Sequence, residues 1–142
     1  MFGKLLLAAA LIAATVVVQA IFMAMGLRVF RRMDPGYLSR HATVATVIWV
    51  TYLLIPIILD IGLWAFFYYA TGALANLEDA TYFSTVTFTT VGYGDIVLGK
   101  DWRHVSVFEA VNGWIIFGWA TALIMAIIQK LYFQADADPD QF

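Results

Sequence analysis

The segment Thr89-Thr90-Val91-Gly92-Tyr93-Gly94-Asp95 lies between two long apolar stretches, yet it contributes little to a hydrophobic core. Gly92 and Gly94 have no Cβ, so they can take positive-φ conformations. Glycines alternating with threonine, valine and tyrosine allow a short extended backbone to point successive carbonyl oxygens the same way. We interpret the segment as a functional loop; the alternative is a glycine-rich surface turn.

The composition is that of a membrane protein. Of 142 residues, 63% are hydrophobic and only 13% are charged, whereas soluble globular domains have about 25% charged residues. Cysteine is absent, which excludes a disulfide framework and thiol-ligated metals. No basic run or mixed aromatic and basic patch indicates nucleic-acid binding. The length predicts one small membrane domain with no soluble ligand-binding domain and no soluble substrate.

Three apolar runs are long enough to cross a hydrocarbon core of ~30 Å as helices. They cover residues 5–27, 42–71 and 105–131. Residues 72–104 contain a shorter helical pattern and then the glycine-rich segment, and they are too short and too polar to span. Such a loop can enter the membrane and return only where it is buried in protein or lines a water-filled cavity. We therefore predict an all-α membrane protein with three transmembrane helices and a re-entrant loop between the second and third.

The basic residues predict the orientation. Arg28, Arg31, Arg32 and Arg40 all fall between the first and second runs, so we expect that linker on the cytoplasmic side. The N-terminus and the mouth of the re-entrant loop are then outside, and the C-terminus is cytoplasmic. The expected location is the plasma membrane.

The first run has a second interpretation. Lys4, an apolar stretch and then Val18-Gln19-Ala20 are also the pattern of a cleavable signal peptide. An uncleaved helix is favoured, because cleavage would place the arginines outside, against the positive-inside bias. After this run, residues 29–38 mix arginines with apolar side chains. They predict either a short helix in the inner membrane interface or a plain charged linker.

The sequence before the glycine-rich segment predicts a helix over residues 77–88. Asn76 is the candidate N-cap, and Glu78 and Asp79 occupy the first turn, where the helix dipole favours negative charge. The partly negative C-terminal end then faces the membrane centre, where it stabilises a desolvated cation. From Tyr82 to Asp95 the chain resembles the pore loop of the potassium channel family, in its bacterial two-transmembrane form, here with an extra N-terminal helix.

The resemblance implies a selectivity filter. Its potassium-coordinating carbonyl groups would belong to Thr90, Val91, Gly92 and Tyr93. Potassium channel filters are built from four such loops, whose stacked oxygen rings replace the hydration shell of the ion; the Thr90 hydroxyl would form the innermost ring. Because one chain supplies one loop, the resemblance implies a homotetramer among membrane lipids. K⁺ is then the permeant ion, and no cofactor is expected.

The resemblance also implies residues that support the filter. Thr89 and Gly94 would complete the loop, and Asp95 would accept a hydrogen bond behind it. Many relatives donate this bond from a tryptophan at the position of Tyr82, so either the tyrosine hydroxyl substitutes for it or the bond is absent. A buried pore-helix glutamate of some bacterial members corresponds to Val86, so its role in filter inactivation is not expected in this chain.

Two glycines in the third run match the family's gating positions. Gly113 matches the hinge glycine, and Gly118 matches a second glycine further along. Glycine weakens a helix by ~1 kcal/mol relative to alanine, so a bend at either position could open a gate; the alternative is close helix packing at small residues. The hinge is favoured for Gly113, and both interpretations stay open for Gly118. Phe117 and Thr121, one turn apart, match cavity-lining positions.

Asp60 and Glu109 are ionisable residues within predicted spans, where burial of a charge is costly. The topology brings both toward the outer leaflet, where either could contact the pore helix or the back wall of the filter. We favour a protonated or hydrogen-bonded carboxyl group that supports this wall. A proton-sensing role is the alternative.

These features divide the chain into three parts: residues 1–41 (extra helix and cytoplasmic linker), 42–131 (pore domain) and 132–142 (short acidic cytoplasmic tail). Within the pore domain we expect an outer helix over 42–71, a pore helix over 77–88, a filter over 89–95 and an inner helix over 105–131. The predicted function is passive, potassium-selective conduction, without enzymatic activity. A weakly selective monovalent cation channel and a proton-relay transporter subunit are the alternatives. The chain has no internal inverted repeat of the kind found in many transporters, which counts against the transporter.

Overall fold

The computed structural model describes residues 2–33 and 40–133. The elements within these ranges are α1 (Phe2–Arg32), α3 (Ala42–Ala70), α4 (Leu77–Phe88), α5 (Arg103–Ile128) and the π-helical turn η1 (Gln129–Phe133). The described residues form no strand. Three helices are long and apolar enough to cross a membrane: α1, α3, and α5 with its continuation to Tyr132. The predicted class, an all-α membrane protein with three spans, is confirmed.

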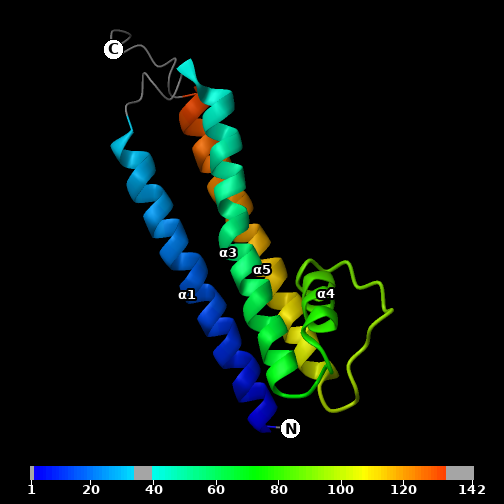
Figure 1. The fold of residues 1–142 in the computed structure, drawn as a ribbon. Coiled ribbons are helices and arrows are strands. Elements are labelled where there is room, and N and C mark those ends of the chain that lie inside the picture. Colours follow the sequence, from blue (N-terminus) through cyan, green and yellow to red (C-terminus); the bar gives the residue numbers. More distant parts are fainter. Residues whose placement is uncertain (1, 34–39, 134–142) are drawn as a thin grey trace.

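The three long helices run side by side, with α3 antiparallel to α1 and α5 (Figure 1). The short helix α4 contacts both α3 and α5 near the end where α3 stops and α5 starts. The segment after α4 projects beyond the bundle on the side away from α1 (Figure 1). This arrangement keeps the glycine-rich segment close to the bundle without making it part of the core.

The helix bounds agree with the sequence most closely at α4, which covers the predicted residues 77–88. The first helix is longer than the predicted run over 5–27: it continues to Arg32, so Arg28, Arg31 and Arg32 belong to the helix and not to the linker. Arginine has a high helix propensity, and basic residues are favourable in a last turn because of the helix dipole. The predicted interfacial turn and acidic tail lie largely outside the described residues.

The core has two parts along the bundle. The first surrounds α4 and includes Trp64 and Tyr68 from α3 and Phe88 from α4, all fully buried. The second lies toward the other end, where Phe30 of α1 packs edge-on against Trp49 of α3 at 5.3 Å between ring centroids. Because α1 contributes to both parts, it is an integral member of the bundle.

Polar contacts also join α1 to α5 and to the residues before it. The Lys4 ammonium donates to the Asp101 carbonyl oxygen at 3.0 Å and lies 4.3 Å from the centroid of the Trp102 ring. Further along, the Asn112 amide donates to the Thr15 hydroxyl at 2.8 Å, and both side chains are buried. The first span, whose position the sequence left open, therefore packs on the other spans of its own chain.

Candidate functional site

The start of α4 is determined by local hydrogen bonds. Asn76 Oδ1 accepts the Asp79 N–H at 2.7 Å, and Asn76 Nδ2 donates to Asp79 Oδ2 at 2.8 Å. The first of these bonds satisfies a free N–H group of the first turn, and the second joins the two side chains. The predicted N-cap is confirmed, and the helix it starts is directed so that its C-terminal end leads into the glycine-rich segment.

The chain reverses at the end of α4. The N–H groups of Val91 and Gly92 both donate to the carbonyl oxygen of Val86, at 3.0 and 3.2 Å. These bonds draw the segment back against the last turn of the helix. The partly negative C-terminal end of α4 therefore lies beside the segment.

Three residues of the segment adopt the left-handed backbone region. Gly92 and Gly94 have φ values of +57° and +76°, which confirms the conformations that glycine permits at these positions. Thr90 has φ +60°, which the sequence did not predict. A β-branched residue rarely adopts this region, and unfavourable backbone angles concentrate at functional sites. The unusual backbone thus begins at Thr90, before the first glycine.

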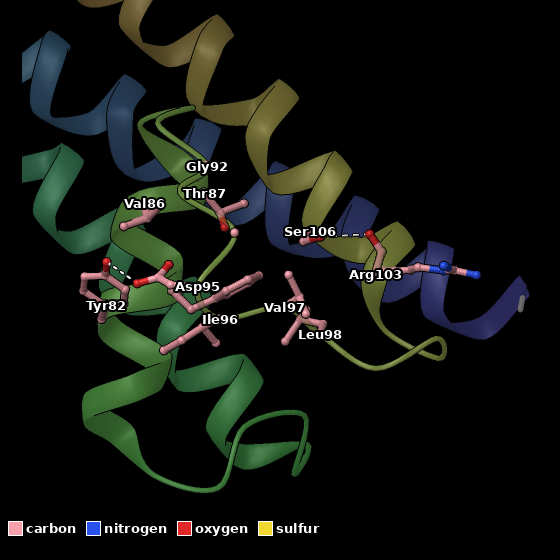
Figure 2. Close-up of a pocket in the computed structure, with 12 residues that line it drawn as sticks. Tyr82, Val86, Thr87, Gly92, Asp95, Ile96, Val97, Leu98, Arg103 and Ser106 are labelled. Atoms are coloured by element: carbon pink, nitrogen blue, oxygen red, sulfur yellow. Dashed lines mark hydrogen bonds between the residues drawn. The ribbon is translucent and has the colours of Figure 1, made fainter.

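Tyr82 and Asp95 are joined across the site. The Tyr82 hydroxyl donates to Asp95 Oδ2 at 2.6 Å, so the tyrosine substitutes for the tryptophan of many relatives (Figure 2). This hydrogen bond is the main cause that lowers the pKa of the Asp95 carboxyl below its usual value. The bond links the middle of α4 to the residue that follows the glycines.

A pocket of about 460 Å³ separates α4 from the start of α5. Its lining comes from α4, from the glycine-rich segment and the residues after it, and from α5: Tyr82, Phe83, Val86, Thr87, Gly92, Gly94, Asp95, Ile96, Val97, Leu98, Arg103 and Ser106 (Figure 2). The pocket therefore lies behind the segment, on the side of the Tyr82–Asp95 bond.

Comparison with known families identifies the family to which the chain belongs. The sequence model of a family described as Ion channel matches residues 54–130, more than half of the chain. The chain belongs to this ion channel family. The match runs from within α3 through α4 and the glycine-rich segment to η1, and it leaves α1 outside. Searches of curated proteins and of solved structures found no match.

Within this ion channel, Glu109 connects three helices. The carboxyl group accepts a hydrogen bond from the Tyr68 hydroxyl at 2.7 Å on Oε2, and Oε1 lies 2.6 Å from the Ser84 hydroxyl. The Ser84 oxygen also lies 3.0 Å from the Ile61 carbonyl oxygen. Glu109 is fully buried. Of the carboxyl groups of Asp60 and Glu109, that of Glu109 is the one that is hydrogen-bonded to α4 among the described residues.

One proton on Glu109 satisfies this group of oxygens. A serine hydroxyl has a single proton to donate, yet the Ser84 oxygen lies within hydrogen-bond distance of two acceptors. If Glu109 is neutral, its O–H donates to Ser84, and Ser84 donates to Ile61. The contacts agree with the favoured interpretation of Glu109, a protonated or hydrogen-bonded carboxyl group, and proton sensing stays the alternative.

Asp60 has a different environment. Its side chain is fully buried on α3, and neither carboxyl oxygen has a hydrogen-bond partner among the described residues of the ion channel. It makes no hydrogen bond to α4, so the predicted support of the pore helix is found at Glu109 alone. Sequence reasoning did not identify Ser84 and Tyr68 as the partners. The available signal was that a buried carboxylate requires nearby donors, and both residues carry hydroxyl groups.

Gly113 and Gly118 differ in their surroundings. A Cβ added at Gly113 would lie 1.9 Å from the carbonyl oxygen of Phe88, whereas a Cβ at Gly118 would meet nothing within 4 Å. Gly113 therefore allows α5 to approach the last turn of α4, which gives it a packing role in this ion channel. Its role as a hinge stays a prediction, as does that of Gly118.

The predicted cavity residues lie on α5 beyond the end of α4. The Phe117 ring packs against Phe88 with 6.1 Å between centroids. Thr121 is exposed in the single chain, and its hydroxyl donates to the Phe117 carbonyl oxygen at 2.8 Å. Phe117 thus contacts the last residue of α4, and Thr121 lies one helical turn further along α5.

Proposed function

We propose that this ion channel is selective for potassium and forms a homotetramer, with one copy of residues 89–95 from each chain. The observation that carries the proposal is the backbone of this segment. Left-handed angles at Thr90, Gly92 and Gly94 follow directly on the C-terminal end of α4, inside the region that matches the ion channel family. The main-chain carbonyl groups of Thr90, Val91, Gly92 and Tyr93 are the proposed ligands of the permeant ion.

Backbone carbonyl groups suit K⁺ because they replace its hydration shell without supplying a fixed negative charge. An ion can then leave each site, and ions at neighbouring sites drive one another onward. The end of α4 contributes a partial negative charge near the inner end of the segment. Thr89 and Gly94 complete the proposed filter, and the Tyr82–Asp95 bond holds its outer end.

The tetramer is proposed from surfaces that a single chain leaves open. Val91 and Tyr93 are 52% and 74% exposed, and Trp114 on α5 is 73% exposed. Large apolar side chains at the centre of a pore domain are expected to be covered by neighbouring subunits. A fourfold arrangement around the filter axis would cover them and would close the ring of carbonyl oxygens.

The proposed orientation places the C-terminal end of α1 at the cytoplasm. Arg28, Arg31, Arg32 and Arg40 all lie at this end of the bundle or in the segment that follows it. Positive residues are retained on the cytoplasmic side during insertion. The α4 end of the bundle then faces outward, so the filter would be entered from outside, as in the potassium channel family.

Planar-bilayer recording of the purified chain in asymmetric potassium and sodium tests the function. Potassium selectivity predicts a reversal potential close to the potassium equilibrium potential, and block by barium. A reversal potential near zero would instead favour the weakly selective cation channel. A current that follows the proton gradient would favour a proton-relay protein.

A pair of glycine substitutions tests whether the filter is the segment named here. Gly94→Ala places a Cβ on a residue with φ +76°, whereas Gly99→Ala does so at a residue without positive φ; neither Cβ meets an atom within 4 Å. We expect Gly94→Ala to reduce the potassium-to-sodium permeability ratio at least tenfold, because a left-handed backbone costs about 1–2 kcal/mol for a residue with a Cβ. Gly99→Ala should keep the ratio. Equal ratios in both variants would assign selectivity to another segment.

A further inference from the structure

An apolar groove lies between α1 and α3, at the end of the bundle remote from α4. Its volume is about 330 Å³. The lining residues are Met25, Gly26, Val29 and Met33 from α1, and Ala45, Ile48, Trp49 and Tyr52 from α3. The proposed conduction does not use this groove, and α1 lies outside the part of the chain that matches the ion channel family.

The floor of the groove is preformed by a close helix contact. A Cβ at Gly26 would lie 2.9 Å from Cε1 of Tyr52 and 3.1 Å from Cζ3 of Trp49. The Tyr52 hydroxyl donates to the Phe22 carbonyl oxygen at 2.7 Å, and Phe30 packs edge-on against Trp49. Both aromatic rings are therefore held in place, and the groove does not need to form when a ligand arrives.

The walls are open and apolar. Met25, Val29 and Ile48 are 47%, 57% and 60% exposed. The single hydroxyl in the lining, that of Tyr52, already donates to a backbone carbonyl. The groove offers no polar group to orient a water-soluble ligand, so its occupant must be a flexible apolar chain. At the side of a membrane-spanning helix pair, this chemistry is that of a lipid acyl chain.

Two arginines adjoin the groove at its membrane-interface end. Arg28 follows Met25 by three residues, and Arg32 follows Val29 by three, so both are neighbours of groove residues on the helix surface. Both are exposed and line a second hollow of about 390 Å³ with Ala24, Leu27 and Arg31. The ion pair between Lys4 and Asp101 lies at the opposite end of α1. Neither arginine has a carboxylate partner in the part of the chain that the structure describes.

A further cation comes from another element. Lys130 of η1 places its ammonium 5.0 Å from the centroid of the Phe30 ring. Lys130 follows the last residues of α5, and Phe30 is near the C-terminal end of α1. The contact therefore places a third positive charge at the end of α1 that carries Arg28 and Arg32. The end of the bundle that carries the groove is thus basic on more than one helix.

We propose that the groove and the adjoining arginines bind one anionic phospholipid, with an acyl chain along Gly26 and Trp49 and the phosphate between Arg28 and Arg32. Two guanidinium groups one turn apart, without a carboxylate partner among the described residues, suit a phosphate that is not neutralised by a cationic group of its own headgroup. Basic pockets between transmembrane helices are suited to anionic headgroups. The proposal is independent of which ion the channel conducts.

Native mass spectrometry of the purified full chain in detergent tests the site. Phosphatidylglycerol and phosphatidylcholine with identical acyl chains are titrated in parallel. Each arginine near an anionic headgroup contributes about 1 kcal/mol, which is about fivefold in affinity. We therefore expect phosphatidylglycerol to bind at least fivefold more tightly, and Arg28→Gln and Arg32→Gln each to weaken it about fivefold. Arg103→Gln, the same charge change at the opposite end of the bundle, should leave binding unchanged.

A second pair of variants separates a lipid site from a general positive surface. Val29→Trp fills the groove from an exposed position, and Val17→Trp adds the same bulk at a similarly exposed position, 55%, outside it. Val29→Trp should abolish the preference for phosphatidylglycerol, and Val17→Trp should not. Glycerophosphoglycerol, the headgroup without acyl chains, should not compete. The proposal is overturned by equal affinity for the two lipids, by full binding to Val29→Trp, or by competition from the free headgroup.

Discussion

Ser84 of α4 lies 2.6 Å from the carboxyl group of Glu109 on α5, and both side chains are fully buried. Tyr68 of the outer helix completes this contact from the other side at 2.7 Å. The three helices of the pore region thus meet at a single carboxyl group. This contact joins α4 to both α3 and α5.

Removal of the Glu109 carboxyl group should destabilise the pore region, whereas an amide should be tolerated. Glu109→Ala leaves the Tyr68 hydroxyl buried without its partner, at a cost of about 1–3 kcal/mol, and leaves Ser84 with the Ile61 carbonyl oxygen as its remaining partner. The amide of Glu109→Gln can donate to Ser84 and accept from Tyr68, so the free energy of unfolding of this variant should lie within about 1 kcal/mol of the wild-type value. Thermal unfolding in detergent measures both, with Glu78→Ala, at the exposed start of α4, as the control. A Gln variant as unstable as the Ala variant would show that an ionised carboxylate is required.

The Tyr82–Asp95 bond should determine the pH at which the Asp95 carboxyl is protonated. The hydrogen bond lowers the pKa of Asp95. The stability that this bond adds to the fold is therefore present at neutral pH and is lost as the pH falls through the lowered pKa. Tyr82→Phe removes the donor and should raise the Asp95 pKa, so that the acid change begins at a higher pH. A carbon-13 NMR titration of the Asp95 carboxyl measures the shift, with Tyr69→Phe as the control. An unchanged Asp95 titration in Tyr82→Phe would contradict the assignment.

Alanine at Gly113 and at Gly118 should have opposite effects. Gly113→Ala brings a Cβ to 1.9 Å from the Phe88 carbonyl oxygen, so we expect a loss of about 1–3 kcal/mol or more through overpacking. Gly118→Ala meets no atom within 4 Å and should stabilise α5 by up to about 1 kcal/mol, because alanine favours helix. Thermal unfolding separates the two. Should Gly113→Ala fold as stably as the wild type, the close contact with α4 is not required.

The Asn112–Thr15 bond should hold α1 to the inner helix. Hydrogen bonds between membrane helices contribute about 0.6 kcal/mol on average and up to about 1.7 kcal/mol. Thr15→Val should lower the free energy of unfolding by an amount in this range, because valine keeps the shape of the side chain and removes the acceptor. A double-mutant cycle with Asn112→Leu isolates the pairwise term. A coupling energy of zero would mean that α1 is held by apolar contacts and by its contact at Lys4.

Much of this architecture followed from local properties of the chain. The lengths of the apolar runs predict three spans, since a helix must be long enough to cross the bilayer. The Asn76 cap and the acidic first turn predict the start of α4, because both act within one helical turn. The positive φ of Gly92 and Gly94 follows from the lack of a Cβ. These features depend on neighbours in sequence, so the sequence was sufficient for them.

Tertiary structure alone decided which distant residues meet. Glu109 and Asp60 are both carboxylates in predicted spans, yet among the described residues only Glu109 is hydrogen-bonded to α4, through a serine 25 residues away. The 97-residue separation of Asn112 and Thr15 likewise gave no sign that α1 would join the inner helix. Gly113 matched a hinge in sequence, but its contact with Phe88 gives it a packing role. Such contacts depend on how the helices are rotated and spaced, which no local pattern specifies.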